Sequence, residues 1–360
     1  MGYSNSTSNT PEAASVEIPF DMPVIDYAAM HGSPEERAKW LDELDKGFQT
    51  YGFVYLANSS IPQEMVDKAF EWSRRLFALP LDVKMKAKHP AYETPYSHRG
   101  YAPQGVGHTV QLLFDPDEID KTKITEPEIK ETFELGNGMP DSGLVPNNWV
   151  PEEDLPGFRA FHERWFVECT KLAQSLLRCL GEVLKLEDKD LLCKQESKHD
   201  AHISLMHYPN IPVEPLRSGK KSRLNAHSDY GSLTMLFQGE IGGLEVHDGE
   251  VYKPIVPKKG TVILNVGDML ERQTNGRWKS SLHRVTAPRE IMLQEGYDPN
   301  ATVVDRYTIV YFCQPNADVV IDNFPGCEKA GRWKPNMIGD WEEKMTSLEW
   351  LHKRYTAEFH

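Results

Sequence analysis

The chain has 360 residues, enough for one large domain or two average ones with a sizeable core. Its 40 Lys and Arg residues against 54 Asp and Glu residues give a formal net charge of −14. This charge would repel a polyanion, so we expect no nucleic-acid partner. No apolar run approaches the length of a membrane span and no secretory signal peptide is recognisable, so we also expect no membrane partner.

The cysteines indicate the redox compartment. There are five, an odd number, and their spacing is irregular: Cys169, Cys179, Cys193, Cys313 and Cys327. Such a set is typical of reduced thiols and does not form a disulfide framework, so we expect a cytoplasmic protein.

The N-terminal part predicts a disordered tail, two helices and a long connection. Residues 1–17 are rich in Ser, Asn, Thr and Pro, which favours disorder. Amphipathic patterns with Pro and Gly at their ends predict helices at 35–50 and 62–77. Residues 88–157 are rich in Pro, Gly and charge and show little periodicity. A connection of that length is usually a functional lid or substrate loop.

The second part predicts one long helix followed by many short strands. Apolar residues recur at helical spacing from Phe158 to Leu184, which predicts a support helix with one apolar face. After residue 200 the apolar period becomes two, and strands separated by Gly, Pro and Asn turns are expected near 202–208, 232–237, 243–247, 261–265, 281–286, 305–313 and 318–321. This pattern predicts a mainly β fold with α elements, in which a double-stranded β-helix (jelly-roll) core carries supporting helices on one side. Residues 288–303 read as a surface insertion, and 341–356 as a C-terminal helix that closes over the mouth of the barrel.

Three side chains predict a metal site. His227 and Asp229 are two residues apart, so both point to one face of an extended strand or strand end. His283 lies far along the chain, which allows several strands to intervene and return to the same point. Two imidazoles and one carboxylate are the ligand set of non-haem Fe(II) oxygenases, whereas closed structural zinc would want a fourth protein ligand.

A second pair predicts an anion site. Arg306 and Thr308 are also two residues apart on an expected strand and therefore share a face. A guanidinium beside a hydroxyl suits a buried carboxylate.

The other histidines carry no comparable signal. His199, His202 and His207 lie near Cys193, but their spacing matches no zinc pattern, and strand alternation sends His202 and His207 to opposite faces.

Several short sequence segments of the chain, taken in order, resemble those of one family. The segment Asn225-Ala226-His227-Ser228-Asp229-Tyr230-Gly231 is followed in order by similar segments at 242–246, 262–268, 274–280 and 306–312, and is preceded by others at 22–26, 47–53, 77–80 and 131–136. Over about residues 18 to 350 the chain resembles the isopenicillin N synthase-like Fe(II)/2-oxoglutarate-dependent dioxygenases, most closely the fungal members.

The resemblance implies a ligand set and a reaction. Fe(II) would bind the Nε2 atoms of His227 and His283 and the Asp229 carboxylate, while 2-oxoglutarate would chelate it. Arg306 and Thr308, with Tyr208, would hold the distal carboxylate. The enzyme would use O2, with ascorbate as an accessory reductant, to oxidise a C–H bond of a small molecule in secondary metabolism, and would release succinate and CO2. Hydroxylation is the default outcome; desaturation, oxidative cyclisation and ethylene formation use the same iron and stay open.

The substrate pocket is predicted from the same comparison. Tyr230 and Phe312 should flank it, and Tyr96, His98, Arg99 and Tyr101 should lie on the lid that closes it. Aromatic walls suit a planar or alicyclic substrate. Ser204 stands where the nucleobase-type branch tends to carry Arg, which argues against a pyrimidine.

The expected organisation is one integrated catalytic unit, acting as a monomer or weak homodimer. Its predicted segments are the tail (1–17), a helical and mixed region with lid loops (18–157), the jelly-roll core with its support helix (158–340) and the C-terminal helix (341–360). Two alternatives stay open: an iron oxidase of the same family in which Arg306 holds the primary substrate, and a non-catalytic small-molecule-binding protein on this fold. A zinc hydrolase is a more distant third. A Ser-His-Asp hydrolase is not indicated either, because the sequence shows no Gly-x-Ser-x-Gly elbow.

Overall fold

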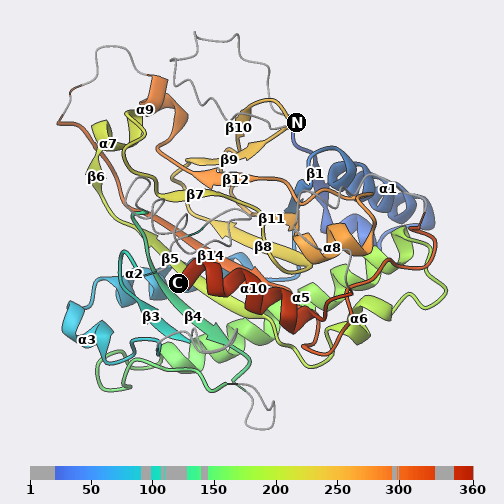
Figure 1. The fold of residues 1–360 in the computed structure, drawn as a ribbon, viewed down its shortest axis with the longest axis horizontal. Helices are drawn as coiled ribbons and strands as arrows, with labels where there is room; N and C mark the ends of the chain where they lie inside the picture. Colours follow the sequence, from blue (N-terminus) through green and yellow to red (C-terminus); the bar gives the residue numbers. More distant parts are fainter. Residues whose placement is uncertain are drawn as a thin grey trace, which may run out of the picture.

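The computed structural model describes residues 21–90, 99–106, 109, 128–138, 145–293, 298, 300–328 and 344–359 (Figure 1). The predicted tail (1–17) and the predicted lid residues Tyr96 and His98 lie outside the described residues.

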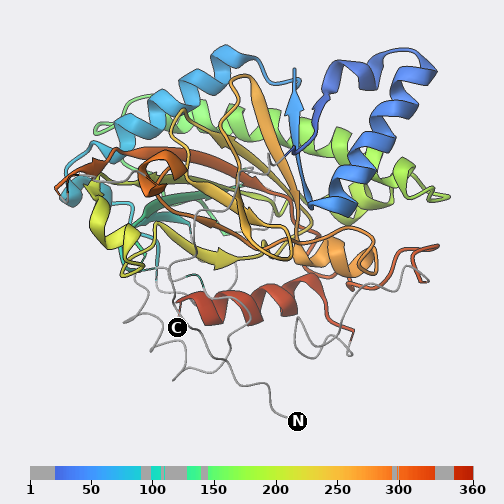
Figure 2. The same cartoon turned by 90° about the horizontal axis from the view of Figure 1, so that it is seen from above.

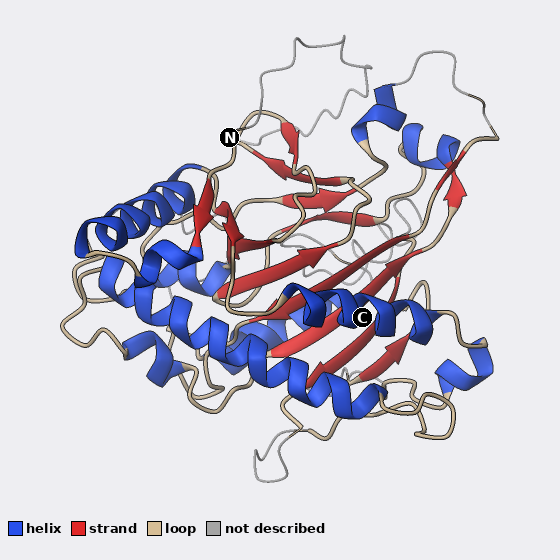
Figure 3. Ribbon diagram, turned by 180° about the vertical axis from the view of Figure 1, so that it is seen from behind, coloured by secondary structure: helices blue, strands red, loops and turns tan. Residues whose placement is uncertain are grey.

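Two facing sheets form the centre of the molecule (Figure 3). The larger sheet has the strand order β1-β2-β11-β8-β14-β5-β4-β3, and the smaller has the order β10-β9-β12-β7. A separate pair, β13-β6, joins the end of the segment expected to be a surface insertion to residues 211–212. The strands are β1 (Val24–Asp26), β2 (Phe53–Ala57), β3 (Gly100–Ala102), β4 (Glu131–Gly136), β5 (His202–Tyr208), β6 (Ile211–Pro212), β7 (Leu224–His227), β8 (Leu233–Gln238), β9 (Leu244–His247), β10 (Tyr252–Pro254), β11 (Thr261–Val266), β12 (His283–Val285), β13 (Thr302–Val303) and β14 (Arg306–Phe312).

Helices cover the outer face of the larger sheet. Figure 2 shows α1, α2 and α5 on one side of the sheets and α10 on the opposite side. The described helices are η1 (Tyr27–His31), α1 (Pro34–Thr50), α2 (Gln63–Phe77), α3 (Leu81–Met85), α5 (Phe158–Val183), α6 (Leu191–Gln195), α7 (Val213–Arg217), α8 (Asp268–Gln273), α9 (Arg289–Leu293) and α10 (Ser347–Phe359).

Local sequence explains where α1 begins and ends. The Ser33 hydroxyl accepts from the backbone N–H of Glu36, the Glu36 carboxylate accepts from the N–H of Ser33, and Pro34 starts the helix. The chain leaves α1 through Gly52 at φ 72°, where a Cβ would lie 2.1 Å from the carbonyl oxygen of Lys279. Only glycine fits where the two backbone segments approach so closely. This close approach places the start of β2 next to the segment that leads to β12.

Alternation along the strands separates a helix-facing side from an inner side. On β14, Tyr311 packs towards α5, where its hydroxyl lies 2.9 Å from that of Thr170. Phe237 of β8 packs edge-on against Trp165 of α5, with ring centroids 5.0 Å apart. Residues of the opposite parity on β14, including Arg306 and Thr308, line an internal cavity between the two sheets. The predicted helices, the long support helix and the jelly-roll fold are confirmed.

Two details differ from the sequence-based expectation. The region 88–157 was expected to lack regular structure, but β3 and β4 belong to it and extend the larger sheet, with β4 paired to β5. Its pattern was obscured because β4 buries both faces and so shows no simple alternation. The strand expected at 318–321 is wrong: this segment makes only an isolated bridge, Val320 to Thr346.

Two further expectations concerned the state of the cysteines and the presence of membrane-spanning helices. All five cysteines are free. In the described part of the chain, we find no helix with both the length and the apolarity needed to cross a bilayer.

Candidate metal centre and cosubstrate cavity

Antiparallel pairing of β7 with β12 brings the two predicted histidine ligands together. His227 is the last residue of β7, His283 is the first residue of β12, and the two are direct register partners. Their ring centroids lie 4.2 Å apart. Asp229 follows in the turn after β7, and its Oδ1 lies 3.7 Å from His227 Nε2 and 3.5 Å from His283 Nε2. The three ligand atoms are buried and fall within 4.8 Å of one another.

Hydrogen bonds orient all three side chains towards one point. His227 Nδ1 lies 2.8 Å from the carbonyl oxygen of Asn225, and His283 Nδ1 lies 3.1 Å from that of Ser281. A carbonyl can only accept, so each Nδ1 carries the proton and each Nε2 keeps its lone pair for a metal.

The carboxylate is oriented in the same way. Asp229 Oδ2 accepts from the Thr234 hydroxyl at 2.6 Å and from the Asn265 amide at 2.7 Å, which leaves Oδ1 facing the imidazoles. Metal ligands in proteins are typically fixed by such outer partners.

The electrostatics of the triad favour a neutral His227 and an ionised Asp229, whereas His283 holds a proton more readily than an ordinary imidazole. Burial lowers the pKa of His227 to about 3. Burial acts against the charge on Asp229, but the His283 imidazole outweighs it and lowers the pKa of the Asp229 carboxyl. Burial also opposes protonation of His283, yet Asp229 raises the pKa of that imidazole. A divalent cation would replace the proton that this pair shares.

An anion cradle lies across the inner cavity from the triad. This cavity, about 430 Å³, is lined by all three triad residues together with Tyr208, Arg306 and Thr308. The Arg306 side chain is 1% exposed, and its Nε donates to the carbonyl oxygen of Ile241 at 3.3 Å. Its Nη1 and Nη2 atoms and the Thr308 hydroxyl are buried without a hydrogen-bond partner among the described residues. Buried polar groups rarely stay unsatisfied, so this set fits a bound carboxylate.

Tyr208 completes the cradle. It is the register partner of Arg306 across β5 and β14, and the guanidinium carbon lies 5.1 Å from its ring centroid. Its hydroxyl contacts the sulfur of Met206 at 3.3 Å. The ring therefore lies beside the guanidinium along the cavity wall.

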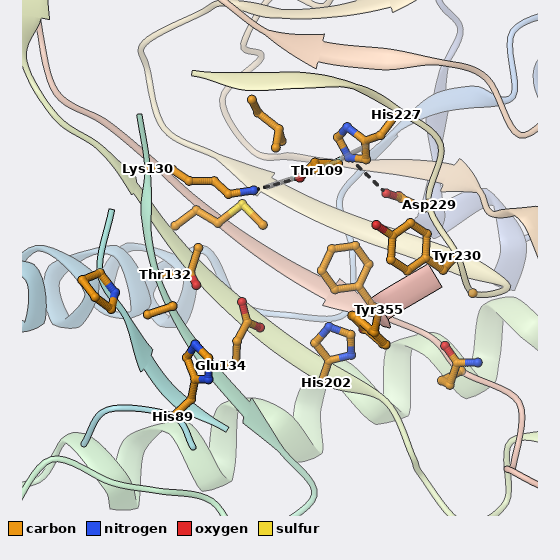
Figure 4. A pocket seen from close by; sticks show the side chains of 17 residues that line it. His89, Thr109, Lys130, Thr132, Glu134, His202, His227, Asp229, Tyr230 and Tyr355 are labelled. Atoms are coloured by element: carbon orange, nitrogen blue, oxygen red, sulfur yellow. Dashed lines mark hydrogen bonds and ion pairs between the residues drawn. The ribbon is translucent and has the colours of Figure 1, made fainter. Parts of the chain in front are cut away.

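An outer cavity opens on His227 and Asp229 of the same triad (Figure 4). Its lining includes His227 and Asp229 and extends over β4, β5 and α10 to His89, Lys130, Thr132, Glu134, His202, Met206, Tyr230, Phe312, Gln314 and Tyr355. A cavity with a mixed polar and aromatic lining next to the triad suits a small-molecule substrate.

Only some of the predicted pocket residues line the outer cavity. Tyr230 and Phe312 line the outer cavity. Ser204 is buried on the same face of β5 as His202 and Met206 but does not line the cavity itself, and its hydroxyl donates to Glu134 Oε1 at 2.7 Å. Tyr101 is buried on the other side of β4, where its hydroxyl donates to Glu131. The guanidinium of Arg99, a buried residue, lies over Gly136.

The two histidines of β5 point to opposite faces, as expected. His202 lines the cavity, where it stacks on Phe312 with centroids 4.7 Å apart. His207 faces the helices and bonds to Glu131 at 2.7 Å.

The C-terminal helix is tied to the metal loop. Arg354 of α10 pairs with Asp268 at 2.7 Å, and both side chains are almost fully buried. Its Nη2 donates to the carbonyl oxygen of Ser228, between two of the triad residues, and its guanidinium stacks over Tyr230 at 4.1 Å. The backbone N–H of Asp268 in turn donates to the carbonyl oxygen of Asp229 at 2.7 Å. Helix α10 is therefore part of the site.

The sequence did not predict the role of several of these residues in the site. Glu134 and Thr132 lie in the segment 131–136 that resembles the family and on one face of β4, but the strand itself was not predicted. Arg354 and Asp268 are ordinary residues of amphipathic helices until the fold brings them together. Asn265 was inside a quoted motif, but its contact with Asp229 depends on the pairing of β11 with β8.

Two facing sheets with a buried His-Asp-His set and an anion cradle between them define a non-haem iron oxygenase site. The family model described as the N-terminal region of non-haem dioxygenases in morphine synthesis matches residues 22–152, and the 2OG-Fe(II) oxygenase superfamily model matches residues 200–315.

Relatives extend this match over nearly the whole chain. The chain is 40% identical over 354 residues to the 2-oxoglutarate-dependent dioxygenase lolO1 of Epichloe uncinata, with 95% of each chain covered. It is 39% identical over 348 residues to the 2-oxoglutarate-dependent dioxygenase frbA of Dothideomycetidae sp. (strain 11243), covering 94% of this chain and 98% of the relative. The structure of full-length Neurospora crassa T7H in complex with alpha-KG matches with a TM-score of 0.77 and 31% identity, covering 93% and 96% of the two chains. The chain belongs to the 2OG-Fe(II) oxygenase superfamily, and it is an enzyme that uses Fe(II), 2-oxoglutarate and O2.

Replacing Asn265 with Ala should weaken iron binding. The change removes one of the two donors that hold Asp229 Oδ2, so the carboxylate loses its fixed orientation. We expect the affinity for Fe(II) to fall by roughly 10-fold or more, measured by anaerobic titration with iron. The exposed Asn300→Ala variant is the matched control and should bind iron like the wild type. Unchanged affinity in Asn265→Ala would contradict the assigned orientation.

Replacing Arg354 with Gln should destabilise the fold and disturb the metal loop. The variant leaves the Asp268 carboxylate buried without its cation, at a cost of about 3–5 kcal/mol in the free energy of unfolding. Urea denaturation followed by tryptophan fluorescence measures the change. Lys353→Gln removes the same charge from the neighbouring position of α10 and should change stability by less than about 1 kcal/mol. Equal stability of the two variants would show that the pair does not anchor the helix.

Proposed function

We propose that His227, Asp229 and His283 bind the iron, and that Arg306, Thr308 and Tyr208 hold the distal carboxylate of 2-oxoglutarate. One observation supports this proposal. The same inner cavity is lined by two buried imidazoles with a buried carboxylate, and by buried hydrogen-bond donors that lack a partner among the described residues. When bound, the iron supplies the oxygen activation that couples decarboxylation of 2-oxoglutarate to oxidation of a C–H bond.

The protein's own residues position the reactants. Thr234 and Asn265 hold Asp229 so that one oxygen faces the metal position. The guanidinium of Arg306 would hold the distal carboxylate of the cosubstrate, in the same cavity as the triad. Apolar side chains of the inner cavity, among them Leu236, Leu244 and Val285, exclude water from this region.

The substrate would occupy the outer cavity, with its reacting carbon towards the triad. We propose a small molecule of secondary metabolism and hydroxylation as the outcome. Two relatives of fungal origin, lolO1 and frbA, are named 2-oxoglutarate-dependent dioxygenases, which supports cosubstrate use over the alternative oxidase that lacks it. Neurospora crassa T7H has been solved with alpha-KG and thymine, so a ring-sized substrate fits this fold.

We also propose a cellular compartment, an absence of nucleic-acid partners and an oligomeric state. Five free thiols and an excess of carboxylates support a cytoplasmic protein without a nucleic-acid partner. We propose that it acts as a monomer or weak homodimer, because triad, cradle and outer cavity are all built from one chain.

Replacing Asp229 with Ala tests the metal assignment. The variant loses the only carboxylate of the triad, and we expect both bound iron and succinate release from 2-oxoglutarate to fall to background. Metal analysis of the purified protein and a succinate assay measure the two effects. Asp318→Ala, a change at an exposed carboxylate, is the control. Normal consumption of 2-oxoglutarate by Asp229→Ala would refute the assignment.

Replacing Arg306 with Gln tests the cosubstrate assignment separately. Loss of a charge-assisted contact should raise the KM for 2-oxoglutarate by roughly 30-fold or more, while iron binding is retained. Arg284→Gln, which removes a strand arginine from a partly exposed pair with Glu245, should leave that KM unchanged. If Arg306→Gln alters the KM of the primary substrate alone, the arginine serves that substrate, as in the alternative oxidase.

A further inference from the structure

We propose that the carboxamide of Gln238 is a further contact of the cosubstrate cradle. Its Nε2 would donate to the distal carboxylate of 2-oxoglutarate, and its Oε1 would accept from the Arg306 guanidinium. The inference deepens the proposed function and rests on it, because it assumes that Arg306 and Thr308 hold that carboxylate.

Strand pairing places Gln238 beside the cradle. It is the last residue of β8, and its register partner on the neighbouring strand β14 is Thr308 (Figure 1). Directly opposite residues of an antiparallel pair share a face, with Cβ atoms about 4.5–5.5 Å apart. Thr234 and Leu236, which share that face of β8, line the inner cavity. The Gln238 side chain therefore lies one step further along the strand, on the side of the sheet that holds Thr308.

The side chain of Arg306 is directed towards the same end of β8. Arg306 lies two residues before Thr308 on β14, so the two side chains share a face. The Nε of Arg306 donates to the carbonyl oxygen of Ile241 at 3.3 Å, and Ile241 follows Gln238 by three residues. Gln238 therefore has two polar members of the cradle as neighbours.

The amide of Gln238 differs from other interior amides of the chain. Its Oε1 and Nε2 atoms are both buried, and both lack a hydrogen-bond partner among the described residues. By contrast, Asn265 donates to Asp229 at 2.7 Å, and Gln273 donates to Gln195 at 2.9 Å. An amide buried without partners is costly, so a ligand that satisfies it gains affinity.

A bound carboxylate would satisfy the open atoms of the cradle together. These atoms are the Nη1 and Nη2 of Arg306, the Thr308 hydroxyl and the two amide atoms of Gln238. A carboxylate accepts up to about four hydrogen bonds at its two oxygens, so it can accept from the guanidinium, the hydroxyl and the amide at once. Oε1 of Gln238 can then accept a remaining N–H of Arg306. The amide would thus favour a cosubstrate that ends in a carboxylate.

Replacing Gln238 with Met tests this contact. Methionine is similar in length but lacks the amide donor and acceptor. We expect the Kd of 2-oxoglutarate for the Fe(II)-loaded protein to rise by roughly 10-fold, measured by isothermal titration calorimetry without oxygen. The affinity for Fe(II) itself should not change, because the amide is bonded to none of the metal ligands.

The stability of the ligand-free protein separates a binding role from a structural one. Gln238→Met should unfold at the same urea concentration as the wild type or at a higher one, because it removes a buried amide without partners. Gln273→Met breaks the bond to Gln195, so it should lower stability and leave the affinity for 2-oxoglutarate unchanged. Gln63→Met, at an exposed amide of α2, is the surface control and should change neither.

Two results would overturn the inference. One is an unchanged Kd of 2-oxoglutarate in Gln238→Met. The other is a loss of stability in ligand-free Gln238→Met as large as that in Gln273→Met, which would make the amide structural. In both cases, weaker binding of 2-oxoglutarate by Arg306→Gln than by the wild type leaves the proposed cradle intact. Failure of the wild type to bind 2-oxoglutarate would overturn the proposed function, and this inference with it.

Discussion

The pairing of β7 with β12 is the constraint on which the site depends. It sets His227 directly opposite His283 on strands that a long stretch of chain separates, and the turn after β7 adds Asp229. Register in a sheet is discrete, and a slip by one residue would turn one imidazole to the other face. The close approach of Gly267, where a Cβ would lie 2.3 Å from the carbonyl oxygen of Gly231, holds this turn against α8. The geometry of the triad is therefore a property of backbone pairing, which the side chains then refine.

Strand alternation explains why so much of the site was predictable. Residues two apart on a strand share a face whatever their surroundings, so His227 with Asp229 and Arg306 with Thr308 could be paired from local spacing alone. The jelly-roll fold followed from the change of period after residue 200 together with the family resemblance. The pairing of residues needs only local spacing, whereas the fold also needed the resemblance over most of the chain; the strands and the shared faces agree with the structure.

What escaped prediction depends on contacts between distant segments. Strand β4 lies where both faces are covered, and its mixture of charged and aromatic residues gives no periodic signal. Its place beside β5 turns Glu134 into a cavity residue, and no local rule foretells that neighbour. Arg354 is similar: it lies on the last helix, yet its partner Asp268 and its contacts with Ser228 and Tyr230 are far away in sequence. Residues that support a site are chosen by tertiary packing, so spacing alone cannot identify them.

The charges of the interior indicate that cosubstrate binding and stability are linked. Arg306 and Arg223 are both buried, and burial together with the nearby Arg306 lowers the pKa of Arg223 to about 10. One Nη atom of Arg223 donates to the carbonyl oxygen of Val304, but carbonyls provide no compensating charge. Two neighbouring guanidinium groups away from water are costly unless an anion lies close to them. The dianion 2-oxoglutarate would supply that charge, and a ligand that binds only the folded state stabilises it in proportion to its concentration over Kd. On the proposed assignment, the buried guanidinium of Arg306 would attract the distal carboxylate of 2-oxoglutarate, and this attraction would favour capture of the cosubstrate.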